Sequence, residues 1–248
     1  MSRSRAAAIH LLPTFLVLAV IAALIVFSWY PYPFWQFGKS GKFALSLVLA
    51  AGIAGPLMTW AVYKKGKRGM LFDLWFIAIV QLAAVAWGTF SLYQNRPFWM
   101  VHTVDRFEVL SLRDIDLAWV TDPKFLDRPF TAPLLLLAQM PADNAAYQKL
   151  LREIIFEGKP DLQFRPEYWS LYADKQEIAL LKSGSLVDLR NTRPDSIDAI
   201  DKVVNNHGGD IARLKFAPVH QKDGQFTAVL DAQSGDVIDT LMIDPWVD

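Results

Sequence analysis

The sequence contains no cysteine among its 248 residues, so the chain can form no disulfide, thiolate metal site or thiol nucleophile. Histidine is also scarce. None of the four histidines has a second one at the helical spacing that a zinc site would use: His10, His102, His207 and His220. We expect solvated or structural roles for them, and the sequence predicts no metal and no cofactor.

Motifs of catalysis are missing as well. The chain has no G-x-S-x-G nucleophile elbow, no G-x-x-x-x-G-K-[ST] phosphate loop, no dinucleotide fingerprint and no H-E-x-x-H zinc motif. Acidic pairs such as Asp114 and Asp116 could act as general acid and base or bind calcium, but no spacing motif accompanies them. We assign no catalytic residue and do not expect an enzyme.

Negative charge is nearly absent from the N-terminal part. Residues 1–95 hold eight basic residues and a single acid, Asp73, whereas residues 96–248 carry a net charge of −7. A nucleic-acid surface needs Lys and Arg gathered on one face to neutralise phosphates, and an acidic C-terminal part gives no such footprint. We therefore expect no nucleic acid partner, and two parts of different character.

Long uncharged runs fill the N-terminal part. About 20 apolar helical residues cross a hydrocarbon core of roughly 30 Å. On this basis we predict a transmembrane domain, residues 1–95, with three helices at about 9–30, 43–63 and 71–93. The first run could be a secretory signal, but it ends in the bulky sequence Trp29-Tyr30-Pro31 and not in a small-residue cleavage site, which favours an uncleaved anchor.

Basic residues predict the orientation of these helices. Arg3 and Arg5 precede the first helix, and the cluster at residues 64–68 joins the second and third, so both are expected in the cytoplasm. Lys39 and Lys42 lie on the opposite side and weaken the asymmetry. The prediction is a multi-pass protein of a bacterial inner membrane, with a cytoplasmic N-terminus and a periplasmic domain at residues 96–248.

Small and polar residues follow helical spacing in the second and third predicted helices. Such residues let helix backbones approach closely, either within the chain or against a partner helix. Asp73, in the first turn of its helix, could simply complement the helix dipole. The residues of this set are Ala51 and Gly55 in one helix, and Gln81, Ala84 and Gly88 in the next.

The remainder of the sequence has short apolar runs separated by turn residues, with helical stretches between them, which is typical of an α+β domain. Strands are expected at 107–110 and 133–140 and helices at about 143–157, 173–182 and 195–206. A three-stranded meander should close the domain, with strands at 213–219, 227–232 and 237–243. The predicted fold class is three transmembrane helices followed by a soluble α+β domain.

Several short motifs occur in a fixed order. They include Tyr30-Pro31-Tyr32-Pro33-Phe34, Gly55-Pro56-Leu57-Met58-Thr59, Gln81-Leu82-Ala83-Ala84, Val104-Asp105-Arg106-Phe107 and Asp244-Pro245-Trp246. Together they resemble the type IV pilin accessory proteins of the TfpX/TfpZ group. Where that group often has an acid before Gly-Pro, this chain has the apolar run Leu49-Ala50-Ala51-Gly52, so no role of that acid is transferred.

The resemblance implies an inner-membrane accessory protein or chaperone that assists assembly of a cognate type IV major pilin. The lipid bilayer and that pilin would be its partners, with the pilin helix against the transmembrane helices and the pilin head against the C-terminal domain. Charges just beyond the third helix could bind headgroups or the partner, or form structural ion pairs. The candidate partner-binding residues are Ala51, Gly55, Pro56, Asp73, Gln81, Ala84, Gly88, Arg96, Asp105 and Arg106.

Two other functions remain open from the sequence. The C-terminal domain could bind a small ligand whose presence the helices relay, although only about 20 residues in total are expected in the cytoplasm as an output module. A membrane enzyme acting on a lipid or envelope substrate is the third possibility. A pilin gene next to this one would distinguish the pilin-assembly function from both alternatives.

Overall fold

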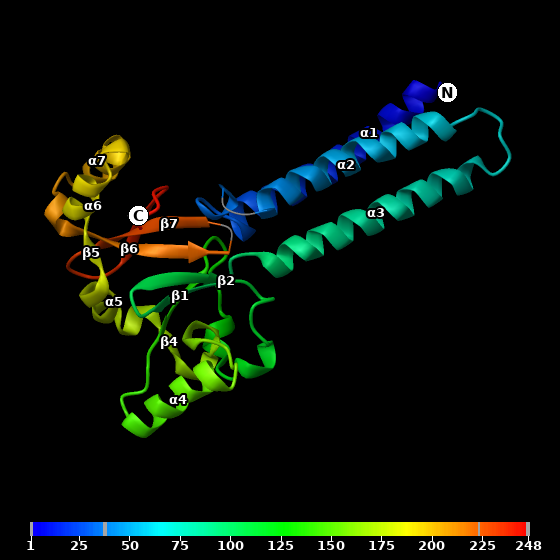
Figure 1. The fold of residues 1–248 in the computed structure, drawn as a ribbon. Helices are drawn as coiled ribbons and strands as arrows, with labels where there is room; N and C mark the ends of the chain where they lie inside the picture. Colours follow the sequence, from blue (N-terminus) through cyan, green and yellow to red (C-terminus); the bar gives the residue numbers. More distant parts are fainter. Residues whose placement is uncertain (1, 37–38, 223, 247–248) are drawn as a thin grey trace. The chain divides into compact units, whose positions relative to one another are not determined.

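The computed structural model describes residues 2–36, 39–222 and 224–246. Contacts between residues divide the chain into two compact units, Met1–Arg96 and Pro97–Asp248. Each unit has its own internal packing, shown in Figure 1. Long apolar helices at the N-terminus and a mixed α/β sheet unit after them confirm the fold class expected from the sequence.

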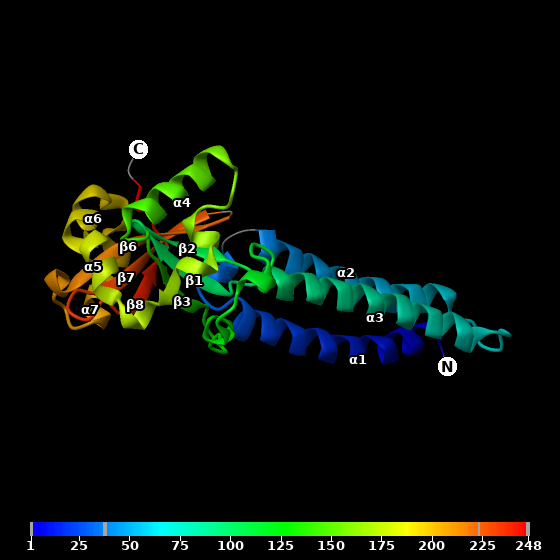
Figure 2. The same ribbon diagram turned by 90° about the horizontal axis from the view of Figure 1, so that it is seen from below.

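The first unit is built from long helices that run alongside one another (Figure 2). Its elements are α1 (Arg3–Leu24), continued by a π-helical turn at Ile25–Trp29, then α2 (Lys39–Val62) and α3 (Met70–Asn95). Among the described residues, three helices are long and apolar enough to span a membrane. Each begins before its predicted first residue, because the polar flanking residues continue the helical backbone past the apolar run. At the other end, α3 continues past its predicted limit, whereas the first two helices end just before theirs.

Helix α2 packs against both α1 and α3. One apolar cluster joins the helices near their middle, through Leu18, Ala51 and Val85. A second contains Ile25, Tyr30 and Leu92. Tyr30 is almost fully buried and donates a hydrogen bond from its hydroxyl to the Leu92 carbonyl at 2.9 Å, which satisfies one of the carbonyls left open at the end of α3.

In the second unit, the described residues form one mixed sheet of eight strands, ordered β4-β3-β1-β2-β6-β7-β8, with β5 paired to β6. The strands are β1 (Trp99–Thr103), β2 (Arg106–Leu110), β3 (Leu134–Ala138), β4 (Trp169–Leu171), β5 (Gly184–Ser185), β6 (Leu214–Gln221), β7 (Gly224–Asp231) and β8 (Val237–Leu241). Parallel pairing occurs between β1 and β3 and between β2 and β6. The antiparallel order β6-β7-β8 confirms the predicted meander.

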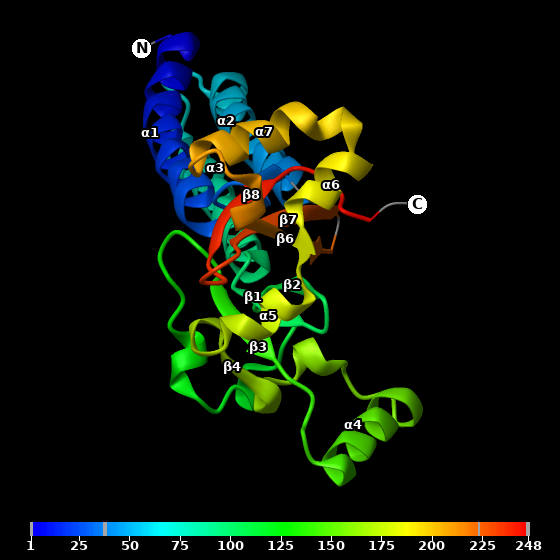
Figure 3. The same cartoon turned by 90° about the vertical axis from the view of Figure 1, so that its left-hand side faces the viewer.

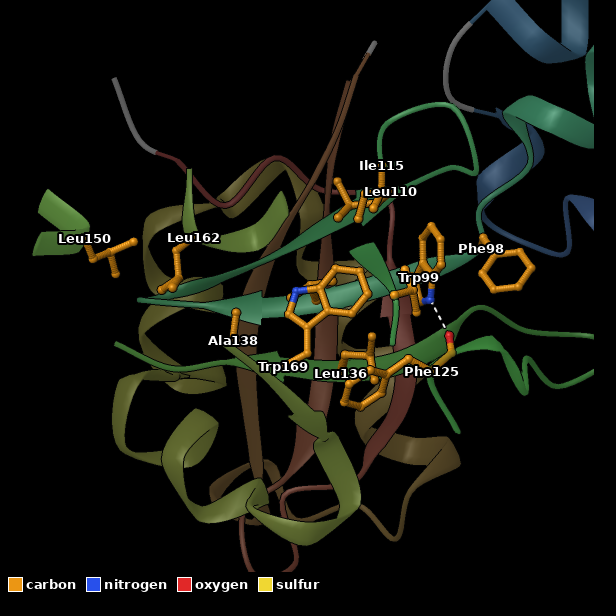
Figure 4. Packing of buried hydrophobic residues seen from close by; sticks show 12 residues of the cluster. Phe98, Trp99, Leu110, Ile115, Phe125, Leu136, Ala138, Leu150, Leu162 and Trp169 are labelled. Carbon is orange, nitrogen blue, oxygen red and sulfur yellow. Dashed lines mark hydrogen bonds between the residues drawn. The ribbon is translucent and has the colours of Figure 1, made fainter. Parts of the chain in front are cut away.

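Helices cover the two halves of this sheet separately (Figure 3). They are α4 (Asn144–Phe156), α5 (Gln176–Lys182), α6 (Leu186–Thr192) and α7 (Ile197–Asn206). Leu150 of α4 packs in a core with Trp99, Leu136 and Trp169, part of which Figure 4 shows. Residues of α6 and α7 form a second core with β6, β7 and β8.

Several elements of the second unit were not predicted from the sequence. All five residues of β1 are buried, so the strand lacks the apolar–polar alternation of a half-exposed strand. The stretch Gly184-Ser185 forms β5, and Ser185 is also the N-cap of α6. A Cβ on Gly184 would lie 2.3 Å from the Phe216 ring, so this pairing requires glycine.

Candidate partner-binding site

Two glycines of the predicted small-residue surface lie at the contact between α2 and α3. A Cβ on Gly55 would come within 1.8 Å of Gln81 Oε1, and a Cβ on Gly88 within 2.7 Å of the Leu47 side chain. Neither position has room for a side chain unless its neighbour moves. The structure therefore uses both glycines for packing within the chain, which was one of the two roles open from the sequence.

Gln81 links the same helices by hydrogen bonds. Its Nε2 donates to the Ala51 carbonyl of α2 at 2.9 Å and lies 3.4 Å from the Thr14 hydroxyl of α1. Its Oε1 is buried and has no hydrogen-bond partner among the described residues. An unsatisfied amide oxygen in hydrocarbon is costly. The close approach of Gly55 also restricts where the Gln81 side chain can move.

A second polar contact joins α1 and α2 closer to the end where α1 begins. His10 Nδ1 lies 2.6 Å from Thr59 Oγ1, and the Thr14 hydroxyl donates to the His10 carbonyl. Arg3 Nε donates to the Tyr63 carbonyl. Sequence reasoning treated His10 as isolated and did not include Thr59. Its four-residue spacing from Gly55, on the same face of α2, was the available signal.

The other candidate residues of the first unit occupy different environments. Ala51 and Pro56 are buried, whereas Ala84 is exposed on α3. Asp73 Oδ2 lies 2.5 Å from Lys67 Nζ in a half-exposed ion pair. Arg96 is 6% exposed, donates from Nη1 to the Tyr93 carbonyl at 2.7 Å and stacks its guanidinium 3.6 Å from the Tyr93 ring centre.

Asp105 and Arg106 belong to the second unit, where they stand at the turn between β1 and β2. Their side chains form an ion pair of 2.9 Å, and both are more than one-third exposed. Arg106 also lies 4.8 Å from the Trp246 ring centre. This geometry matches the structural ion pair that the sequence left open, and partner contact by these residues stays a prediction.

Sequence reasoning missed an apolar groove between α1 and α3. Its volume is about 450 Å³, and it is lined by Ile21, Trp29, Leu82, Val85, Ala86, Thr89, Phe90 and Tyr93. Thr89 Oγ1 is buried and has no hydrogen-bond partner among the described residues. The α3 residues of the groove recur at steps of three and four, but an apolar stripe of that kind in a membrane helix also fits plain lipid contact, so the sequence did not single it out.

Another groove, between α1 and α2, is larger but chemically uniform. It has a volume of about 720 Å³ and a wholly apolar lining that includes Phe15, Ala22, Val48 and Ile53. Lipid chains can fill such a groove without leaving a polar group unsatisfied. The groove with Thr89 differs, because Trp29, Thr89 and Tyr93 give its lining polar groups.

Ionisable groups of the second unit serve its packing. Burial lowers the pKa of His102 to about 4, although the negative charge of Asp105 acts to raise it. Hydrogen bonds from Arg165 and Lys159 lower the pKa of the Glu153 carboxyl to about 2. Glu153 Oε2 lies 2.8 Å from Arg165 Nη1 and its Oε1 lies 3.0 Å from Lys159 Nζ, which ties α4 to the following loop.

No group of three or more potential metal ligands occurs in the part of the chain that the structure describes. The molecule thus combines an apolar helical unit, able to span a membrane, with an α+β unit whose polar clusters are paired internally. That combination defines a membrane-anchored protein whose most distinctive open feature is a groove between helices.

Several known proteins are similar to this chain in sequence. The family model described as fimbrial assembly protein FimB matches residues 1–37. The serogroup I fimbrial assembly protein of Dichelobacter nodosus is 32% identical over 173 residues, which cover 68% of this chain and 66% of that protein. The serogroup E1 protein is 34% identical over 176 residues, with the same two shares. The protein of serogroups C1 and C2 is 36% identical over 112 residues, 43% of this chain and 83% of that protein.

The chain belongs to the fimbrial assembly protein family. This membership confirms the resemblance to pilin accessory proteins that its motifs indicated. The matched part of this chain spans about 66% of the length of the serogroup I and E1 relatives. No solved structure matches the chain.

Proposed function

We propose that this protein is an inner-membrane accessory protein that assists assembly of a cognate type IV major pilin. The observation that carries the proposal is its similarity to proteins named for fimbrial assembly over most of its length. Its basic segments before α1 and between α2 and α3 favour a cytoplasmic N-terminus. In that orientation the unit of residues 97–248 faces the periplasm, where pilin heads are exposed before assembly.

The groove between α1 and α3 is the surface we propose for the pilin helix. A pilin waits in the membrane with one apolar helix in lipid, and that helix suits a groove lined mostly by apolar side chains. The exposed face at Ala84 is the alternative, because Gly55, Gln81 and Gly88 are already engaged within the chain.

The remaining sequence candidates enter the proposal as secondary contacts. Asp105 and Arg106 would meet the pilin head through their half-exposed charges. Pro56, Asp73 and Arg96 are held by contacts within the chain or lie buried, so they would act through the shape of the helical unit. A role as dedicated chaperone follows if the pilin is released once it enters the pilus.

Deleting the gene tests the function. Surface pili and total pilin are scored separately, with the wild-type gene restored as the control. We expect loss of surface pili while pilin is still made. Normal piliation in the deletion strain would overturn the proposed function.

A matched pair of substitutions tests the groove. Ala86 lines it and Ala84 does not, although both are exposed alanines of α3 two residues apart. Because the chain has no cysteine, Ala86→Cys and Ala84→Cys each give a single site for crosslinking to cysteines placed along the pilin helix. Crosslinks from position 86 alone support the groove, and crosslinks from position 84 alone transfer the site to the other face.

A further inference from the structure

The connection between β2 and β3, residues 111–133, carries large apolar side chains on its surface. Leu126 is 42% exposed and Phe130 is 70% exposed. Phe125, which directly precedes Leu126, is buried in the core of the second unit. Both side chains therefore present apolar surface on one short segment.

Hydrogen bonds hold this segment against the first residues of the second unit. Arg128 Nε donates to the Pro97 carbonyl at 3.1 Å, and the Leu134 amide donates to the Phe98 carbonyl at 2.9 Å. The Trp99 indole donates to the Phe125 carbonyl at 2.6 Å, the bond drawn as a dashed line in Figure 4. The C-terminal half of the segment is thus fixed to residues 97–99.

Residues 97–99 follow α3 directly in the chain. Arg96 is the C-cap of that helix, and three residues of extended chain span at most about 10 Å. The headgroup region adds roughly 5 to 8 Å on each side of a 30 Å hydrocarbon core. If α3 crosses the bilayer, the segment from Phe125 to Phe130 is therefore held near the headgroup layer by covalent connection.

The backbone of the segment suits an environment poor in water. Arg128 Nη1 donates to the carbonyls of Pro129 and Phe130, so the guanidinium satisfies acceptors that water would otherwise have to reach. Pro123, Pro129 and Pro133 carry no amide N–H that needs a partner. The charges of residues 122–130 also cancel, with two acids and two bases.

We propose that Leu126 and Phe130 insert into the boundary between headgroups and acyl chains of the bilayer that holds α3. Since the segment has no net charge, the attraction is hydrophobic and requires no anionic lipid. The contact adds a second, non-covalent attachment of the α+β unit to the membrane surface. It does not depend on the proposed role in pilus assembly.

Spin labels on the full chain test this contact. Phe130→Cys and Thr131→Cys each introduce the only thiol, and the second variant keeps both proposed lipid-contacting residues. Phe156→Cys is the matched control, because Phe156 is 81% exposed at the end of α4 and lies outside the segment. Each labelled protein is placed in phosphatidylcholine nanodiscs, and collisions with oxygen and with a water-soluble nickel chelate are measured by electron paramagnetic resonance.

Oxygen concentrates in lipid and the nickel chelate in water, so the two collision rates identify the environment. We expect oxygen to dominate at positions 130 and 131 and the order to be reversed at position 156. Nickel-dominated collisions at both 130 and 131 would place the segment in water, and low rates with both reagents would place it against protein. Either result overturns the proposal.

Discussion

The side-chain amide of Gln81 donates a hydrogen bond to the Ala51 carbonyl at 2.9 Å, and its oxygen lies where a Cβ on Gly55 would stand. The bond joins α3 to α2, and glycine at position 55 makes the space for it. The polar residue in α3 and the glycine in α2 thus form one helix–helix contact.

Replacing Gly55 should weaken this contact between α2 and α3. In Gly55→Ala the added methyl group would displace Gln81 and break its bond to Ala51, at a cost of about 1 kcal/mol, as for other hydrogen bonds between membrane helices. We expect a lower midpoint of thermal unfolding for the protein in detergent. Gly52→Ala is the control, because its Cβ would meet only Leu18 Cδ1 at an ordinary 3.6 Å. Equal midpoints for the two variants would contradict the assignment.

Burial of His102 should make stability fall in mild acid. Its pKa is lowered to about 4 in the folded protein, compared with 6.5 for the free side chain. The unfolded chain therefore binds more protons between these values, so the free energy of unfolding decreases as pH drops through that window, by about 3 kcal/mol at most. Denaturant titration of the full chain at pH 7.5 and pH 4.5 measures the change.

A variant isolates that contribution. His102→Leu removes the titrating group from a site where the imidazole Nε2 has no hydrogen-bond partner among the described residues, so most of the loss between pH 7.5 and pH 4.5 should disappear. His220→Gln changes a side chain that is 46% exposed and should retain the loss. A wild-type pH dependence in His102→Leu would show that another group is responsible.

Glu153 should also stabilise the protein less as the pH falls, but in a more acidic window than His102. Arg165 and Lys159 lower the pKa of its carboxyl to about 2, so the contribution is complete above the unfolded value of about 4.3 and is lost as pH falls toward 2. We expect Glu153→Gln to be less stable than the wild type at pH 7, with the difference shrinking in acid. Glu177→Gln, at an exposed site, should match the wild type throughout in denaturant titrations.

The turn between β1 and β2 carries backbone strain. Val104 has φ of 53°, a left-handed conformation that β-branched residues rarely adopt, and its side chain is 60% exposed. Val104→Asn should raise the free energy of unfolding by about 1 kcal/mol, because asparagine tolerates this conformation. Val104→Ala keeps a Cβ and should change it less. Denaturant midpoints at one pH compare the three proteins, and an unchanged midpoint for the asparagine variant would argue against strain.

Prediction from sequence succeeded where a local pattern decides the structure. The strands β6, β7 and β8 follow from apolar runs separated by turn residues at 222–224 and 234–236. The strand β1 was not predicted, because all five of its residues are buried and its sequence lacks the alternation of apolar and polar residues. For the candidate site, the sequence indicated Gly55, Gln81 and Gly88 as contact residues, but it did not separate contacts within the chain from contacts with a partner.

The sequence by itself determined that the N-terminal part contains apolar helices long enough to cross a bilayer, because run length and missing charge are properties of the chain alone. It also carried the family membership in the order of its motifs. Only the tertiary structure decided that Gln81 meets Gly55, that Thr89 lines a groove between α1 and α3, and that the segment of Phe130 is held beside residues 97–99. These relationships join residues far apart in sequence, and they depend on how helices and strands pack, which no local pattern specifies.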